Sequence, residues 1–205
     1  MSIVVEHEKR RKKILEKVIN VFVKEGFENT TFQKIADHCG ITRTTLYIYF
    51  RNKNEIFNYS IKLLLTKVEE DIKSIRSDSS LNNIEKITKV LLNIFTHLEK
   101  NRRLLSVILD YLLYFSKSRT DPEQRVRRRT LKLRHILASL VIEGVKSREL
   151  KPVNIKNADD YLYNFIEAAI FRLVVLRRKT VGDLRKTAIF AVRQFASKKY
   201  LSQLS

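Results

Sequence analysis

Apolar residues in the first quarter of the chain recur every three or four positions, which is the spacing of one face of an α-helix. In the first predicted helix, from about Glu6 to Glu25, that face is formed by Ile14, Val18, Val21 and Phe22. Gly26 is expected to end it, because glycine adopts the left-handed conformation found at many helix ends. A second, short helix is predicted from Thr30, which stands at capping-box spacing from Gln33, to Gly40.

The next stretch, residues 41–57, reads "ITRTTLYIYFRNKNEIF" and combines apolar residues with many hydrogen-bonding side chains. Thr42 is suited to cap a third helix that runs to about Tyr49, and Asn52 with Glu55 predicts the start of a long fourth helix. Further helices are expected over residues 82–99, 102–116, 122–148, 157–178 and 181–201. No window alternates apolar and polar residues, so an all-α fold without a sheet is predicted.

Composition sets further limits. Of the 205 residues, 44% are hydrophobic and 31% charged, so the chain can bury a real core. The longest apolar tract, residues 165–176, contains Glu167 and Arg172 and is shorter than the ~20 residues of a membrane span. The amino-terminal residues lack the apolar segment of a secretory signal, so a cytoplasmic protein without a membrane partner is expected.

The single cysteine, Cys39, excludes an internal disulfide and shares a face with apolar residues, which favours a packed side chain over a redox sensor.

The residue pattern does not predict catalysis. The four histidines are far apart in the sequence. A glycine-rich phosphate loop, a zinc-protease motif and a hydrolase serine motif are all absent from the sequence. We therefore predict no enzyme, no metal site and no cofactor.

The third predicted helix has the size and chemistry of an element that enters DNA. Eight residues at 1.5 Å each span about 12 Å, which is also about the width of the major groove of B-DNA. Leu46 and Phe50, four residues apart, would anchor this helix to the core. The positions left to face outward are Arg43, Thr44 and Tyr47. Arginine can read guanine and threonine can meet a thymine methyl group, so a helix-turn-helix is predicted over about residues 31–50.

Over residues 14–57 the sequence resembles the DNA-binding domain of TetR-type transcriptional regulators. The shared features are a first helix that ends at Gly26-Phe27, the segments "TTFQKIA" and "GITRTTLYIYF", and the opening "NKNEIF" of the fourth helix. The resemblance implies base contacts by Arg43, Thr44 and Tyr47. It implies phosphate contacts by Thr31, Thr42, Thr45, Tyr49 and Lys53. Many members of the family have glycine where this chain has Thr44, a difference that affects which DNA sequence is read.

The resemblance also implies how the chain is organised. Residues 6–57 would form the helix-turn-helix DNA-binding domain, and residues 58–205 a larger helical ligand-binding and dimerisation domain. Two copies would pair through the helices near 157–178 and 181–201 and read a palindromic operator on double-stranded DNA. The implied function is a sequence-specific transcriptional regulator, by family default a repressor, which a small-molecule effector releases from DNA. Candidate residues for the effector pocket are Phe95, Tyr111, Tyr114, Phe115, His135, Tyr161 and Phe165.

Charge is distributed unevenly along the chain, whose formal net charge is +19. Residues 1–57 carry 11 basic and 7 acidic residues, whereas residues 58–205 carry 30 and 15. In the densest cluster, from Arg125 to Arg134, one helix face would carry Arg125, Arg128, Arg129 and Lys132. Three interpretations stay open: a solvated face that steers DNA, the mouth of a pocket for an anionic effector such as an acyl-CoA, or a surface for an acidic protein.

The same charge supports an alternative function. An effector-independent DNA-binding factor, associated with the nucleoid or linked to cell division, would use the same helix-turn-helix and gain affinity from the basic surface. Steep salt dependence with little sequence preference would favour it over a repressor.

Overall fold

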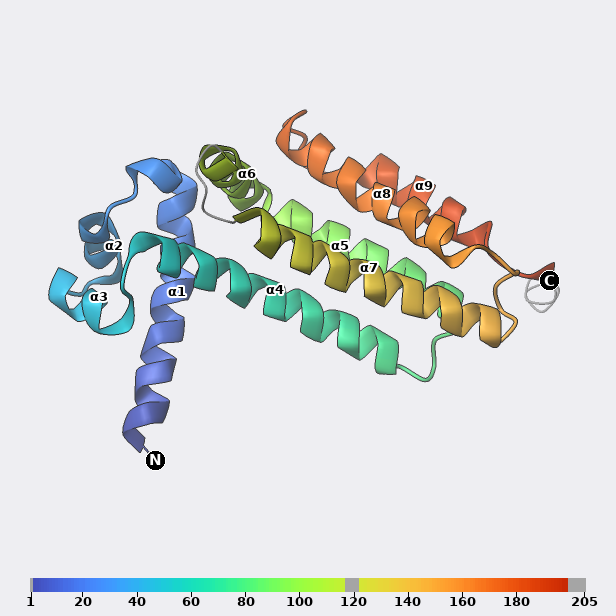
Figure 1. The fold of residues 1–205 in the computed structure, drawn as a ribbon, viewed down its shortest axis with the longest axis horizontal. Helices are drawn as coiled ribbons and strands as arrows, with labels where there is room; N and C mark the ends of the chain where they lie inside the picture. The colour runs from blue at the N-terminus through green and yellow to red at the C-terminus, as the bar shows by residue number, and fades with distance from the viewer. Residues whose placement is uncertain (1, 117–121, 199–205) are drawn as a thin grey trace.

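The computed structural model describes residues 2–116 and 122–198. Over these residues the chain forms nine α-helices and no strand, which confirms the all-α fold. β-Structure in the same ranges is limited to one antiparallel bridge, between Leu150 and Ala196. Figure 1 shows α1, α2 and α3 gathered at one end, with longer helices extending away from them. None of the described helices is both long and apolar enough to cross a membrane.

The amino-terminal unit, defined as residues 2–60, contains the predicted short helices. Its elements are α1 (Ser2–Asn29), α2 (Phe32–Cys39), α3 (Arg43–Tyr49) and the beginning of α4 (Lys53–Ser77). The predicted caps of α3 and α4 are confirmed. The Thr42 hydroxyl accepts the backbone N–H of Thr45 at 3.0 Å, and the Asn52 side chain accepts that of Glu55 at 2.9 Å. Each cap satisfies an N–H that has no partner inside its own helix.

Two predicted boundaries around α1 and α2 are wrong. α1 begins at Ser2 and continues beyond Gly26, where the backbone kinks at φ 76° and ψ 168° and then forms a further helical turn. This turn moves the cap of α2 by one residue, from Thr30 to Thr31, whose hydroxyl accepts the N–H of Lys34 at 3.2 Å. Thr30 is buried instead, and its hydroxyl donates to the carbonyl of Gly26 at 2.6 Å.

The helices of the amino-terminal unit pack around one hydrophobic cluster. The buried members from α1 to α4 include Val18, Phe22, Phe27, Ile35, Leu46, Phe50, Ile56 and Phe57. Helix α6 adds Leu104, Val107 and Tyr111 to the same cluster. The predicted domain boundary between residues 57 and 58 falls inside α4, which runs through it without a break. The division into two domains therefore stays a prediction, and the core of the amino-terminal unit includes a wall from α6.

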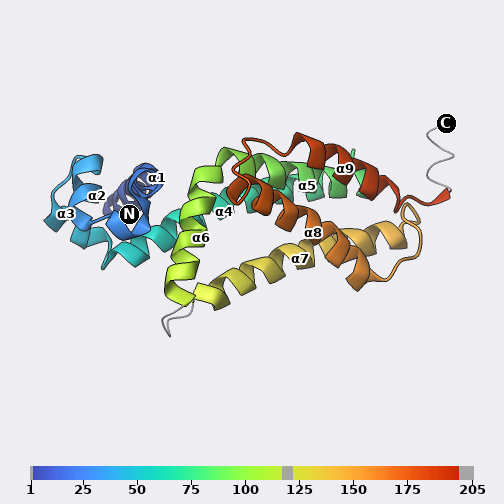
Figure 2. The ribbon, with the colours of Figure 1, turned by 90° about the horizontal axis from the view of Figure 1, so that it is seen from above.

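The remaining helices form an elongated bundle. They are α5 (Asn83–Lys100), α6 (Arg102–Ser116), α7 (Pro122–Lys146), α8 (Ile155–Val174) and α9 (Gly182–Arg193). Helix α5 packs against α4, α7, α8 and α9 and lies at the centre of a second hydrophobic cluster. Figure 2 shows α6 lying across the molecule between the amino-terminal unit and the rest of the bundle. Helix α6 is therefore shared by both ends of the protein.

Helix α9 ends earlier than the apolar spacing predicted. It stops at Arg193 because the chain then pairs with the segment that follows α7. The Lys151 N–H donates to the Phe195 carbonyl at 2.9 Å, and the Ser197 N–H donates to the Glu149 carbonyl at 2.8 Å. Local periodicity carries no information about such distant partners. The last residues of the predicted helix, 199–201, lie outside the described residues, and α8 ends at residue 174 instead of 178.

Candidate nucleic-acid interface

Helix α3 is anchored by one side and presents the opposite side to solvent. Leu46 and Phe50 are 0% and 1% exposed and hold the helix to the core, as predicted. The exposed residues of α3 include all three that the sequence placed outward, Arg43, Thr44 and Tyr47. A seven-residue helix mounted in this way has its polar side free to meet a partner.

Arg43 and Tyr47 form a connected pair on that exposed side. The Arg43 guanidinium donates to the Tyr47 hydroxyl at 3.1 Å and lies 5.6 Å from the centre of its ring. The Tyr47 ring also stacks on Phe32 of α2, with centroids 4.6 Å apart and planes at 27°. Because Phe32 of α2 packs against one face of the ring, Tyr47 holds its position although it is 49% exposed. The pair is thus preorganised, which reduces the entropy lost on binding.

The three threonines assigned to phosphate contacts lie at helix starts. Thr31 caps α2 and Thr42 caps α3, each by accepting a backbone N–H. The hydroxyls of Thr42 and Thr45 also lie 2.8 Å apart. A capping hydroxyl uses its oxygen as an acceptor and keeps its O–H as a donor, so these groups can still donate to a phosphate oxygen. In Thr42 and Thr45 one of the two hydroxyls already donates to the other.

Tyr49 is tied to α1. Its ring stacks on the imidazole of His7, with centroids 4.5 Å apart and planes at 28°. Tyr49 is half-buried at the edge of the core cluster. The structure therefore places it at the junction of α3 and α1, and its predicted phosphate contact stays a prediction.

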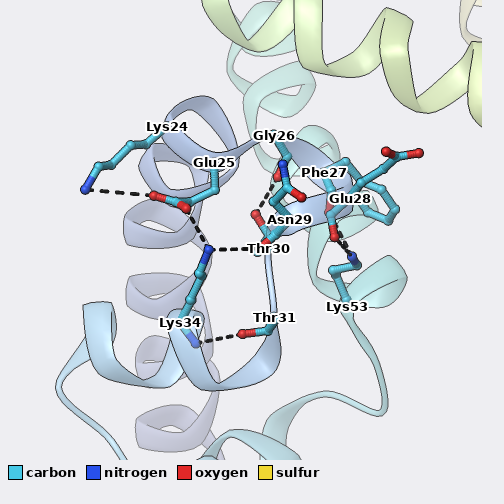
Figure 3. A network of polar contacts seen from close by, with 10 residues as sticks. All are labelled: Lys24, Glu25, Gly26, Phe27, Glu28, Asn29, Thr30, Thr31, Lys34 and Lys53. Atoms are coloured by element: carbon cyan, nitrogen blue, oxygen red, sulfur yellow. Dashed lines mark hydrogen bonds and ion pairs between the residues drawn. The ribbon is translucent and has the colours of Figure 1, made fainter.

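Lys53 joins the start of α4 to the end of α1, as Figure 3 shows. Its ammonium donates to the carbonyls of Phe27 at 2.8 Å and Glu28 at 3.0 Å, and lies 4.5 Å from the centre of the Phe27 ring. Partial burial lowers the pKa of Lys53, and the Glu28 carboxylate partly offsets this effect. An ammonium has three donors, so one remains for the phosphate contact that the sequence predicted.

Lys34 makes a similar connection on the other side of the same turn (Figure 3). Its ammonium donates to the Glu25 carboxylate at 2.7 Å and to the Asn29 carbonyl at 3.2 Å. The bond with Lys34 lowers the pKa of Glu25. Two lysines thus hold the kinked end of α1 against the starts of α2 and α4.

Sequence reasoning missed Ile48, which belongs to the exposed side of α3. It is 66% exposed, among the highest values for a large apolar side chain in the described residues. At 100° per residue, position 48 lies 200° from the buried Leu46, so the helical wheel contained the signal. An apolar side chain in a helix is usually interpreted as core, and this assumption hid Ile48. For the same reason the contact between Phe32 and the Tyr47 ring was not predicted, because Phe32 was interpreted only as a core residue.

A cavity of about 320 Å³ lies inside the bundle. Helices α4 to α8 all contribute to its wall, which is mainly aliphatic and includes Leu65, Ile108, Leu133 and Ile170. Its volume falls in the range of about 300–1,000 Å³ typical of small-molecule sites. The cavity therefore has the size and the apolar lining of a ligand pocket.

Of the predicted pocket residues whose side chains the structure describes, Tyr111 lines this cavity. Phe95 is fully buried in the bundle core, and His135 is exposed on α7. Tyr161 and Phe165 contact each other edge to face on α8, away from the cavity wall. The side chains of Tyr114 and Phe115 lie outside the described residues. Aromatic spacing identified one wall residue, because most of the wall is aliphatic.

The polar part of the cavity wall contains a charged pair. Lys132 of α7 and Glu69 of α4 lie 2.6 Å apart, and both are about half exposed. His97, also in the wall, contacts the Asp71 carboxylate at 2.8 Å and lowers the pKa of that group. In the part of the chain that the structure describes, no group of three or more metal-ligating side chains is placed to hold a metal ion.

The predicted basic face of α7 is only partly described. Arg128 is exposed, and Lys132 follows it by one turn. The side chains of Arg125 and Arg129 lie outside the described residues. Arg134 belongs elsewhere: it pairs with Asp159 at 2.7 Å and with Asp160, both on α8. These bonds raise the pKa of Arg134 and fasten α7 to α8.

The outer faces of α8 and α9 expose several large apolar side chains. Those most exposed are Phe171 on α8, Val175 and Leu176 directly after this helix, and Phe190 on α9. Other apolar side chains of the same two helices, including Ile166, Ala169, Leu173 and Val192, are buried within the chain. Phe190 is 66% exposed and lies in the range 181–201 through which the sequence predicted pairing of two copies.

The arrangement of α2 and α3 is that of a helix-turn-helix DNA-binding protein. Residues 14–59 match the family described as bacterial regulatory proteins, tetR family. Residues 14–59 thus carry the DNA-binding domain of the TetR family of transcriptional regulators. The match includes α2, α3 and the start of α4, which together carry the residues described above.

Similarity to known proteins extends along most of the chain. The fatty acid metabolism regulator protein of Bacillus subtilis is 25% identical over 171 residues, which are 81% of this chain and 84% of that protein. The nucleoid occlusion factor SlmA of Mannheimia succiniciproducens is 25% identical over 169 residues, 80% of this chain and 76% of that one. The crystal structure of FadR from Bacillus subtilis in complex with stearoyl-CoA shares the fold, with a TM-score of 0.68 and 22% identity. The superposition covers 91% of this chain and 97% of FadR.

The Lys53 contacts predict a structural role that can be separated from a phosphate contact. Replacing Lys53 by Met removes two hydrogen bonds between α4 and α1, so the free energy of unfolding should fall by about 1–2 kcal/mol. Urea denaturation followed by circular dichroism measures the change. Lys62→Met, an exposed position on the same helix, is the matched control and should be nearly neutral. Two results together would assign Lys53 to DNA instead: unchanged stability of Lys53→Met, and a slope of log K against log salt reduced by ~0.9, the value for one phosphate contact.

Proposed function

We propose that the protein is a repressor that reads a palindromic operator through α3 and leaves it when a small molecule fills the cavity. The observation that carries the proposal is the exposed side of α3, where Arg43 and Tyr47 are preorganised above a fully buried anchor. Since its target is chromosomal DNA, the protein would act in the bacterial cytoplasm.

The chemistry of α3 matches readout in the major groove. Arg43 can donate two hydrogen bonds to one guanine, and Thr44 can contact a thymine methyl group. Ile48 adds an apolar surface of the kind that also suits a thymine methyl. Thr31, Thr42, Thr45, Tyr49 and Lys53 would set the register through phosphates, which carry no sequence information themselves.

Two copies are needed for a selective site, because one short helix touches few bases. The exposed apolar residues of α8 and α9 supply a surface that a second copy would cover, which agrees with the dimers usual in this family. The surface includes Phe171, Val175 and Phe190, which are each more than half exposed in the single chain. A twofold axis there would present both α3 helices to successive major grooves, about 34–36 Å apart.

The cavity favours an effector with a long apolar part and an anionic head. Aliphatic residues from α4 to α8 would enclose the apolar part. Lys132 at the polar wall could exchange Glu69 for the anionic group, and Arg128 lies one turn away on the same face. Acyl-CoA thioesters have this chemistry. The names of two similar proteins, a fatty acid metabolism regulator and a FadR bound to stearoyl-CoA, agree with this class.

Tyr111 offers a route from the cavity to α3. Its ring lines the cavity and also contacts Phe27 and Phe57, at centroid distances of 4.6 Å and 4.8 Å. Phe27 is the residue whose carbonyl and ring hold Lys53 at the start of α4. A ligand that displaces Tyr111 would therefore bias the packing under α4 and change the separation of the paired α3 helices.

The alternative, a DNA-binding factor that needs no effector, rests on two observations. Residues 58–205 hold most of the excess positive charge, and the nucleoid occlusion factor SlmA is among the similar proteins. The cavity and its link to Tyr111 favour the effector-dependent function, since a factor without an effector has no use for either.

Sequence-specific binding is tested by fluorescence anisotropy with DNA from upstream of the protein's own gene and with scrambled DNA, across a salt series. The native sequence should bind at least ~10³-fold more tightly than the scrambled one. Tyr47→Ala should remove most of this ratio, whereas Tyr47→Phe keeps the ring on Phe32 and separates the role of the hydroxyl. Equal binding of both DNAs, abolished by salt and insensitive to Tyr47, would contradict a repressor and favour the alternative.

The effector class is tested with stearoyl-CoA as the probe. It should bind the wild-type protein and release the operator. Ile108→Phe places a ring in the cavity wall and should weaken binding by about tenfold or more, equivalent to ~1.4 kcal/mol. Leu113→Phe, on the same helix but 66% exposed, is the matched control and should respond like the wild type. Absence of binding to the wild type, or equal binding by Ile108→Phe measured by calorimetry, would contradict this site and class.

A further inference from the structure

The first three turns of α1 lie outside the hydrophobic core. Ile14 is the first residue of the helix that belongs to the buried cluster, yet the helix begins at Ser2. Figure 1 shows this part of α1 projecting beyond α4 at the end of the molecule that carries α2 and α3. These turns do not build the core, so another role is needed to explain a helical extension at this position.

Two contacts dock the extension against α3 and α4. The His7 imidazole stacks on the ring of Tyr49, the last residue of α3, with ring centroids 4.5 Å apart. Arg11 lies 4.2 Å from the ring centre of Tyr59 and 5.3 Å from that of Phe50, and 3.9 Å from the Glu55 carboxylate. His7, Arg11 and Ile14 are spaced by four and three residues, so this inner face of the helix continues the core face. The extension therefore has a fixed direction relative to α3.

One flank of the extension is basic. Arg10, Lys13 and Lys17 are spaced by three and four residues, so they line up along one side of the helix, and all three are exposed. Glu6 is the acidic residue at the outer end of this side, while Glu8 is engaged with Arg11 at 3.9 Å. We call Arg10, Lys13 and Lys17 the basic flank.

The inner end of the basic flank belongs to the part of the molecule where α1 packs against α2. Burial raises the pKa of the Cys39 thiol at the end of α2, and the Lys17 ammonium partly offsets that rise, so the two side chains interact electrostatically. Arg10 and Lys13 extend the same line toward the end of α1 that stacks on α3.

We propose that the basic flank of α1 binds the phosphate backbone bordering the groove that α3 enters. This inference rests on the proposed DNA binding and adds to it a second, sequence-independent contact on a different helix. DNA seated on α3 brings phosphates close to the docked extension, and lysine and arginine there release condensed counterions on binding. The flank contributes affinity and orientation, while α3 contributes the choice of sequence.

The flank differs from the basic residues of the bundle in position. Lys67 and Lys73, for example, are exposed on α4, which extends away from α3. Charges there act on DNA only through the screened field, whose range is about 8–10 Å at physiological salt. A direct contact and a distant field therefore predict different effects for the same loss of charge.

The test is a salt titration of binding to a random-sequence duplex by anisotropy, so that no operator has to be known. The variant is Arg10→Gln with Lys13→Gln. Its matched control is Lys67→Gln with Lys73→Gln, which removes the same two charges. The flank variant should reduce the slope of log K against log salt by about 2, or ~0.9 for each phosphate that the protein no longer neutralises. The control should leave the slope close to that of the wild type.

The possible outcomes separate this inference from the proposed function. Equal slopes for the flank variant and the wild type, both of which bind the duplex, would overturn the phosphate contact alone. Equal reductions of the slope in the flank variant and its control would assign the effect to overall charge and would also overturn it. A wild-type protein that binds no duplex would contradict the proposed function and the inference together. Circular dichroism on each variant confirms that these exposed substitutions leave the fold intact.

Discussion

The packing of Phe22, Phe27, Phe57 and Tyr111 is the constraint on which the rest of the structure depends. Phe57 lies 4.8 Å from Phe22 and from Tyr111, and 5.0 Å from Phe27, in edge-on and tilted arrangements. Each such aromatic pair contributes about 0.5–1.5 kcal/mol beyond the area it buries. The four rings come from α1, the turn after its kink, α4 and α6, so one cluster fixes the relative positions of three helices.

The polar contacts around the cluster transmit its geometry to α3. Lys53 donates to the Phe27 carbonyl and Lys34 to the Glu25 carboxylate, so both lysines contact the segment that carries Phe27 into the cluster. Those contacts link the starts of α2 and α4 to the end of α1, and Leu46 and Phe50 anchor α3 in the same core. Tyr111 belongs to the same cluster and also lines the cavity. The cavity and the core that anchors α3 are therefore connected through one set of buried rings. The same residues therefore keep the DNA-reading surface rigid and provide the route by which a ligand in the cavity would change it.

The parts of the fold that could be predicted are those governed by neighbours in sequence. The caps Thr42 and Asn52 and the anchor formed by Leu46 and Phe50 follow from spacings of three and four residues, and the structure contains all of them. The shift from Thr30 to Thr31 was missed, because the extra turn after Gly26 depends on packing against α4 and α6. The carbonyl partners of Lys53 could not be predicted, because they lie 25 and 26 residues away. Most residues of the cavity wall could not be predicted for the same reason, because helical spacing identifies an apolar face but not the helices that pack against it.

Amide hydrogen exchange in the wild type and in Tyr111→Leu tests most directly whether the aromatic cluster links the cavity to the DNA-reading surface. Leucine keeps the site apolar but removes the ring contacts with Phe27 and Phe57. Exchange should accelerate in the turn after Gly26 and in the first turns of α4, as well as in α6. Leu105→Ala, which alters α6 at the cavity wall but outside the cluster, should accelerate exchange in α6 only. If Tyr111→Leu also affects only α6, the cluster does not couple the two ends of the molecule, and the proposed route from effector to DNA is wrong.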